Sequence, residues 1–192
     1  MRSDLGWSTA ALAAVLLAMP HPPVAAAQLA APAKCTGGQK DSRGRSAVDD
    51  KEVRWEDETV FDDAIRHAHH AWTSHGLNKV KIKPDDGGTI ADLQWQDKKA
   101  TGPGWKNVYG RYTPFPGADT IYLNRAYLDK NKVHGTTSDR RRVAAHELGH
   151  ALGFCHKKVD WYRTLMEGDF FFLPDNGRPT TADRRNYHKL WR

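Results

Sequence analysis

The sequence has few cysteines, no internal repeats and no apolar run long enough to cross a lipid bilayer. Its 192 residues include two cysteines, so at most one disulfide can form within the chain. The longest apolar run spans residues 10–19, whereas a transmembrane helix needs about 20 apolar residues. The composition is neither collagen-like nor that of a disordered chain. We therefore expect one folded domain without a membrane-spanning helix.

The N-terminus has the features of an export signal. Arg2 supplies a positive charge, which Asp4 weakens, and the apolar run at residues 10–19 follows. The small residues Ala25–Ala27 suit cleavage by a signal peptidase. We predict that residues 1–27 are removed and that the protein is secreted to the extracellular space. A retained signal anchor is the alternative.

A net charge of +6 would allow binding to nucleic acid or to an anionic surface. The basic residues are scattered, however, apart from Arg140–Arg142, and the sequence contains no nucleic-acid-binding module. A solvated basic surface is the simpler interpretation. We therefore predict no nucleic-acid partner, and no membrane attachment after signal removal.

Composition divides the rest of the chain into a polar segment and a folded domain. Residues 28–51 are small, polar and charged, which predicts a flexible lead-in or a short pro-segment. Residues 52–192 alternate between strand-like and helix-like patterns, which predicts an α+β domain. The predicted strands span residues 53–55, 79–83, 89–95, 107–112 and 120–123. The predicted helices follow caps at Thr59, at Ser138 and at Thr180 or Thr181.

Residues 146–156 read HELGHALGFCH. His146 and His150 are four residues apart, so on a helix both rings project from one face and can bind one cation. Gly153 tolerates a positive φ and lets the chain turn sharply, which can bring His156 to the same ion. An apolar stripe lies on the opposite face and can pack against a core. This stripe consists of Ala144, Leu148, Ala151 and Leu152.

Three neutral imidazole ligands leave one position of a tetrahedral zinc ion for water, which is typical of a catalytic site. Zinc lowers the pKa of that water and polarises a carbonyl group. Glu147 stands beside the histidine pair and can accept the proton of the water as a general base. The motif therefore predicts a zinc-dependent hydrolase.

The extended motif resembles that of the metzincin metallopeptidases, and all five of its fixed positions match. The resemblance implies a methionine turn beneath the metal, and Met166 stands where that turn is expected. The short domain is most similar to matrixins and to small secreted bacterial metalloproteases. The implied fold is a twisted, mixed five-stranded sheet with a long N-terminal helix, an active-site helix and a C-terminal helix.

Three departures from related families limit this resemblance. Snapalysins match in size but use aspartate as the third ligand, where this chain has His156. Astacins carry a tyrosine two residues beyond the methionine, where this chain has Gly168. The chain also lacks the Pro-Arg-Cys-Gly switch of matrixins. The sequence does not indicate which residues would bind a second zinc ion or Ca²⁺.

Two further segments gain a role from the resemblance. Phe170, Phe171 and Phe172 follow the methionine, where the family has the wall of the S1′ pocket, and this favours an apolar P1′ residue in the substrate. Simple core packing is the alternative. Residues 109–113 have two interpretations, an edge strand for an extended substrate or a surface loop, and we favour the strand.

The two cysteines, Cys35 and Cys155, have two functional interpretations. In a secreted protein an even pair indicates a disulfide, which we predict here. In the alternative, the Cys35 thiolate occupies the fourth position of zinc and keeps the enzyme latent.

Four other histidines gather on or near the first helix, where a solvated face is favoured over a second metal site. These are His67, His69, His70 and His75.

The sequence as a whole predicts a secreted, monomeric zinc endopeptidase that acts on proteins or peptides. His146, His150 and His156 bind Zn²⁺, and Glu147 is the general base. The alternative is a non-catalytic binding protein on a metzincin scaffold. The presence of Glu147 argues against that alternative, because a purely structural zinc site has no use for it.

Overall fold

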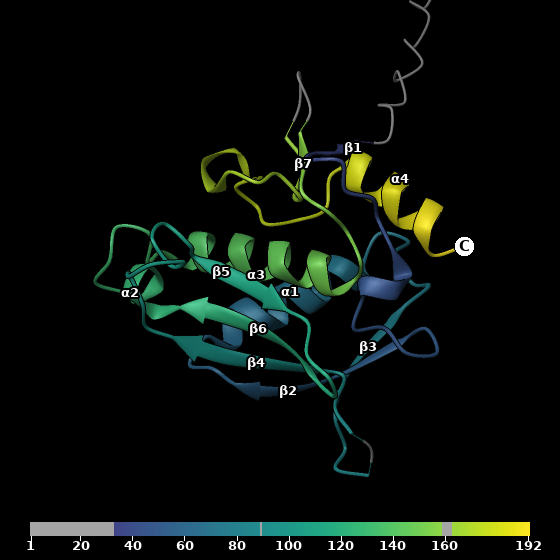
Figure 1. The fold of residues 1–192 in the computed structure, drawn as a ribbon, viewed down its shortest axis with the longest axis horizontal. Coiled ribbons are helices and arrows are strands. Elements are labelled where there is room, and N and C mark those ends of the chain that lie inside the picture. The colour runs from purple at the N-terminus through teal and green to yellow at the C-terminus, as the bar shows by residue number, and fades with distance from the viewer. Residues whose placement is uncertain (1–32, 89, 159–162) are drawn as a thin grey trace, which may run out of the picture.

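The structure is a computed structural model that describes residues 33–88, 90–158 and 163–192. One five-stranded sheet is covered on one face by the helices α1 (Asp62–Thr73) and α3 (Thr137–Ala151), and α4 (Thr181–Leu190) lies on the far side of α3 (Figure 1). The predicted signal at residues 1–27 lies outside the described residues. No helix in the described part of the chain is long and apolar enough to span a membrane.

The sheet contains both parallel and antiparallel neighbours. Its strands are β2 (Glu52–Glu58), β3 (Lys81–Pro84), β4 (Leu93–Lys98), β5 (Gly110–Thr113) and β6 (Asp119–Asn124), in the spatial order β3-β2-β4-β6-β5. Strand β5 runs antiparallel to β6 at one edge, and the other pairs are parallel. The predicted α+β class and mixed five-stranded sheet are confirmed. The strand predicted at residues 89–95 begins later, at Leu93.

Two of the predicted helix caps are wrong. The Thr59 hydroxyl donates to the Asp97 carboxylate of β4, and α1 begins without a side-chain cap. The cap of α3 is Thr136, whose side chain accepts a backbone N–H of the first turn, whereas the Ser138 hydroxyl donates to the Asp175 carbonyl. In both cases a neighbouring polar group competes for the hydroxyl, and the sequence pattern alone does not show that competitor.

The core lies between the sheet and the two helices that cover it. The predicted apolar stripe of α3 is fully buried there, together with Trp72 of α1 and Trp95 of β4. Each buried leucine of the stripe contributes about 1.5–3 kcal/mol relative to an exposed one. This burial fixes the rotation of α3, so that the face carrying His146 and His150 turns away from the main core. The predicted cap Thr180 is confirmed at the start of α4.

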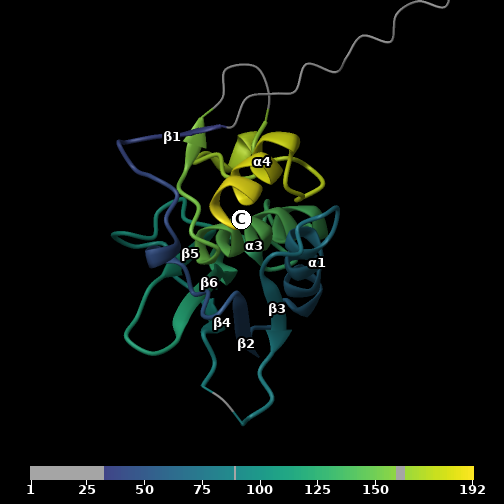
Figure 2. The same ribbon diagram turned by 90° about the vertical axis from the view of Figure 1, so that its right-hand side faces the viewer.

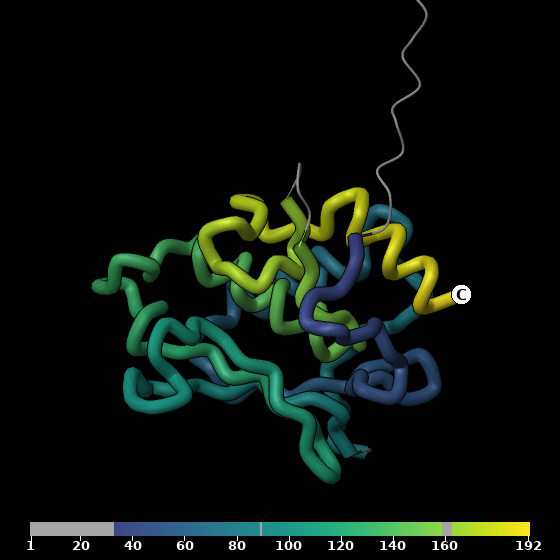
Figure 3. Tube along the Cα trace, turned by 45° about the horizontal axis from the view of Figure 1, so that its top comes forward, coloured from purple at the N-terminus to yellow at the C-terminus, as the bar shows by residue number. Residues whose placement is uncertain are grey.

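Residues 33–47, which we call the N-terminal strap, run beside the segment that follows α3 (Figure 3). Strand β1 (Lys34–Cys35) pairs antiparallel with β7 (Lys157–Lys158), on the side of α3 away from the sheet (Figure 2). The strap then forms a short 3-10 helix, η1 (Arg43–Arg45). The predicted disulfide between Cys35 and Cys155 is confirmed. The boundaries predicted at residues 27 and 51 stay predictions.

Candidate metal centre

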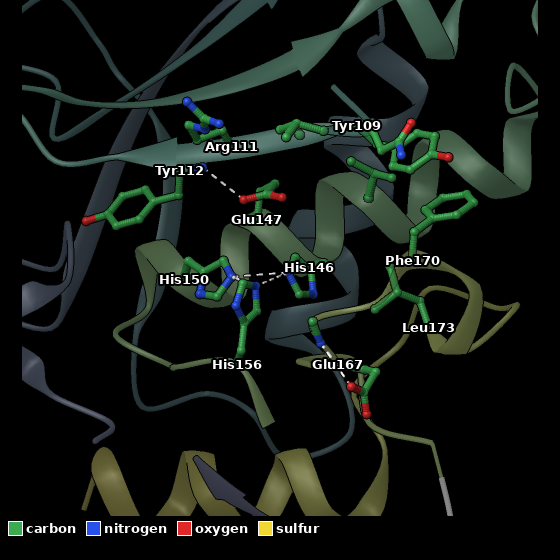
Figure 4. Close-up of a pocket in the computed structure, with 15 residues that line it drawn as sticks. Tyr109, Arg111, Tyr112, His146, Glu147, His150, His156, Glu167, Phe170 and Leu173 are labelled. Atoms are coloured by element: carbon green, nitrogen blue, oxygen red, sulfur yellow. Dashed lines mark hydrogen bonds between the residues drawn. The ribbon is translucent and has the colours of Figure 1, made fainter. Parts of the chain in front are cut away.

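The three predicted metal ligands converge on one point. His146 and His150 come from successive turns of α3, and His156 comes from the segment after it. Their Nε2 atoms lie 3.1 Å (His146–His150), 3.0 Å (His150–His156) and 3.2 Å (His146–His156) apart, and Figure 4 shows the rings pointing toward one another. Nitrogen ligands about 2.0–2.1 Å from a tetrahedral zinc ion are about 3.3 Å apart, so this spacing fits zinc. The group could hold a metal ion.

Backbone carbonyls fix the tautomer of the two helical ligands. His146 Nδ1 lies 2.7 Å from the Leu165 carbonyl oxygen, and His150 Nδ1 lies 2.7 Å from the Phe154 carbonyl oxygen. A carbonyl oxygen can only accept, so each Nδ1 carries the proton and each Nε2 keeps its lone pair. This arrangement is the usual outer support of a metal-bound histidine. It is therefore compatible with a metal site.

Burial also favours the neutral, metal-binding form of these rings. It lowers the pKa of His146 well below the ordinary value and the pKa of His150 to about 4. The pKa of His156 is lowered for the same reason. All three imidazoles are therefore unprotonated near neutral pH, as metal binding requires.

Gly153 makes the turn that brings His156 back to the helix. Its φ is +90°, in the left-handed region that glycine tolerates best. A Cβ atom here would overlap the carbonyl oxygen of Ser42 in the N-terminal strap. The glycine is thus required for its backbone conformation and also for a close approach by the strap. The sequence indicated only the first of these reasons.

Glu147 lies in the same cleft as the three rings, 7% exposed. Its Oε2 accepts a hydrogen bond of 2.9 Å from the backbone N–H of Tyr112 in β5 (Figure 4). Burial raises the pKa of Glu147 to about 7, against the opposing effects of this N–H and of Arg111. A carboxyl group with a pKa near neutrality can both accept and return a proton at that pH.

Met166 lies in a turn beneath α3 and is almost fully buried. Its sulfur sits so close to Gly149 that a Cβ atom there would collide with it. The neighbouring Leu165 supplies the carbonyl that orients His146, and its own N–H donates to the buried Asp183 carboxylate of α4 at 2.8 Å. Sequence reasoning missed Asp183, because a helix-capping aspartate gives no sign of a second partner far away along the chain.

The cleft beside the histidines has a volume of about 330 Å³. One end is lined by Phe170, from η2 (Phe170–Phe172), and its ring stacks on Tyr109 with the centroids 4.2 Å apart. Phe171 and Phe172 are exposed and do not line the cleft. Strand β5 forms another wall of the cleft. Gly110 is needed in this strand, because a Cβ atom there would lie 2.7 Å from a Val143 methyl group.

The other histidines named in the sequence analysis form no second metal-binding cluster among the described residues. His67 lies 3.0 Å from the Gly177 carbonyl oxygen, and the partly buried His69 packs against Trp55 and Trp95. The described residues hold no metal-binding group that includes either of them. Cys35 is bonded to Cys155, so the alternative in which its thiolate caps the zinc is not what the structure shows.

Comparisons with known proteins assign neither a family nor a function to this chain. No protein-family model matches the chain, and no curated protein matches it. The argument for function therefore rests on the residues of the site.

Proposed function

We propose that this chain is a secreted zinc endopeptidase with a metzincin-like catalytic domain. One observation carries the proposal: three Nε2 lone pairs converge within 3.2 Å of one another while a buried carboxylate, Glu147, shares their cleft. The Met166 turn and the tight turn at Gly153 support the resemblance to metzincins. The Cys35–Cys155 disulfide is compatible with an oxidising, extracellular location.

The residues of the site divide the work of peptide hydrolysis. His146, His150 and His156 would hold the zinc ion, and a bound zinc ion supplies Lewis acidity toward water and the scissile carbonyl. Glu147 accepts the proton of the attacking water and delivers it to the amine leaving group. The Tyr112 N–H keeps the Glu147 carboxylate in position for both transfers.

Strand β5 accounts for the choice of an extended peptide as substrate. It is the edge strand of the sheet beside the cleft, with no further strand partner among the described residues. An extended peptide can add to such an edge through backbone hydrogen bonds, which tolerate many sequences. Phe170, Val143 and Leu173 line the cleft and favour an apolar residue just after the scissile bond.

Digestion of casein by the purified protein, with and without a chelator, tests the proposal. We expect cleavage that the chelator abolishes and that added Zn²⁺ restores, because the ligands must regain the ion. Heat-denatured protein controls for contaminating peptidases that withstand heating. Stoichiometric zinc without any cleavage of casein, gelatin or a peptide library would favour the binding-protein alternative.

A further inference from the structure

His156 is held in place by the two residues that flank it in the sequence. Cys155, on one side, is bonded to Cys35 of the N-terminal strap. Lys157, on the other side, is fully buried, and its ammonium lies 2.6 Å from the Asp41 carboxylate of the strap. Both flanking side chains thus reach the strap, while the imidazole between them faces the other two ligands.

Backbone hydrogen bonds extend this attachment along the whole turn. The Thr36 N–H donates to the His156 carbonyl at 2.9 Å, and the Cys155 N–H donates to the Asp41 carboxylate at 3.2 Å. Further along, the Ser42 N–H donates to the Gly153 carbonyl at 2.9 Å, and the Ala47 N–H donates to the carbonyl of Ala151, the last residue of α3, at 2.8 Å. His146 and His150 need no such support, because their helix is anchored in the core.

The buried ammonium of Lys157 explains why these groups stay together. It lies 3.3 Å from Cys155 Sγ and 3.6 Å from Cys35 Sγ, at the centre of the group formed by both sulfurs and Asp41. It therefore fills the place that a cation would take between these atoms, which argues against a second metal site here. A buried ammonium that loses its carboxylate is strongly unfavourable, so the disulfide and the ion pair support each other.

We propose that the Cys35–Cys155 disulfide controls the metal affinity of the histidine site, so that its reduction loosens His156 and weakens zinc binding. The inference rests on the proposed zinc site and adds redox regulation to it. A dithiol is the reductant. It transfers two electrons and two protons, the S–S bond breaks, Cys35 and Cys155 become thiols, and the dithiol closes to a disulfide. The strap is then held by non-covalent contacts alone.

Zinc affinity, measured by competition with a chromogenic chelator, tests the proposal directly. The protein is compared oxidised, after reduction with dithiothreitol and removal of the reductant without oxygen, and after reoxidation. We expect reduction to weaken Zn²⁺ binding about 10–100-fold, the usual cost of losing the outer support of a ligand, and reoxidation to restore it. The double variant Cys35→Ser/Cys155→Ser should match the reduced protein, which excludes any effect of the new thiols as ligands.

A second pair of variants tests the attachment with the disulfide intact. Lys157→Met removes the buried ammonium, and Lys158→Met removes an exposed one from the same strand. We expect weaker Zn²⁺ binding in the first and unchanged binding in the second. Near-ultraviolet circular dichroism confirms that each protein is folded. Equal affinities in the two variants would show that the ion pair does not help to hold His156. If reduction unfolds the chain, the disulfide maintains the whole fold rather than the metal site alone, which overturns the proposal.

The two proposals fail in different ways. Equal Zn²⁺ affinity in oxidised and reduced protein, with two free thiols counted in the latter, overturns redox control but leaves the peptidase intact. No Zn²⁺ binding by the folded, oxidised protein overturns both. Weaker binding only in Lys157→Met would show that the ion pair positions His156 without the disulfide, which also contradicts redox control.

Discussion

The two halves of the histidine site are built in different ways. The helical half, with His146, Glu147 and His150, is positioned by the periodicity of α3 and by the burial of its apolar stripe. The loop half, with Gly153 and His156, is positioned by a strap attached through a disulfide that spans 120 residues of sequence. A local motif can specify the first half, but the second depends on tertiary contacts. Substitutions in the helical half should therefore mainly lower catalytic activity. Substitutions in the loop half should mainly lower stability and metal retention.

The largest expected effect is in the helical half. Glu147→Gln should lower kcat/KM for a peptide substrate about 10²–10⁴-fold and leave the zinc content unchanged, because the amide cannot accept the proton and Glu147 is not a ligand. Activity and elemental analysis of the same preparation check this. Glu58→Gln, on an exposed position of β2, is the matched control. Activity retained by Glu147→Gln would rule out the assigned base.

The next largest effect belongs to the loop half. Gly153→Ala should lower the free energy of unfolding by about 3 kcal/mol or more, since it combines left-handed backbone strain with a collision against Ser42. Gly87→Ala is a control with a similar φ but open space around its Cβ, and it should cost about 1–2 kcal/mol. Urea unfolding measures both. Equal costs would show that the strap does not press on this turn.

A smaller effect comes from a histidine outside the site. The His69 Nε2 atom is buried without a hydrogen-bond partner, and burial lowers the pKa of His69 to about 3. The unfolded chain binds a proton at this residue below about pH 6.5 while the folded protein does not, so stability falls as the pH decreases from 6.5 toward 3.

His69 alone should cost about 2 kcal/mol between pH 7.5 and 5. In His69→Leu this part of the acid loss should disappear, whereas His188→Leu, at an exposed position, should keep it. Urea unfolding of the zinc-free protein at both pH values provides the comparison. An unchanged pH dependence in His69→Leu would show that His69 is protonated in the folded protein as well.

The smallest expected effect concerns substrate choice. Phe170 lines the cleft and Phe172 does not, so Phe170→Ala should reduce the preference for large apolar P1′ residues about tenfold while Phe172→Ala leaves it unchanged. Cleavage-site profiling with a peptide library measures the preference. A charged or unbiased P1′ position in the unmodified protein would contradict the assignment of this wall.

The sequence predicted the helical half of the site well, because spacing on a helix translates directly into a shared face. The alternation of strand and helix patterns in residues 52–192 also predicted the α+β class, and the resemblance to metzincins implied the mixed sheet. It did not reveal the helix cap Thr136, the Tyr112 N–H that holds Glu147, or the contact of Asp183 with the methionine turn. The last two depend on a partner that only the fold brings close, whereas the Thr136 side chain caps a residue three positions away, Asp139.

The cysteine pair shows the same limit. Its disulfide could be predicted from an even count, but the buried ion pair between Lys157 and Asp41 could not, because both residues resemble ordinary surface charges in the sequence. Likewise, Phe170, Phe171 and Phe172 are identical in type, and only packing against Tyr109 separates the buried one from the exposed two.

The most direct test of the account is X-ray absorption spectroscopy at the zinc edge on oxidised protein purified without chelator. The account predicts one zinc ion per chain, surrounded by three imidazole nitrogens and one oxygen ligand, with no sulfur. Protein that takes up no zinc, or zinc with sulfur neighbours, would contradict the assignment of the metal to His146, His150 and His156.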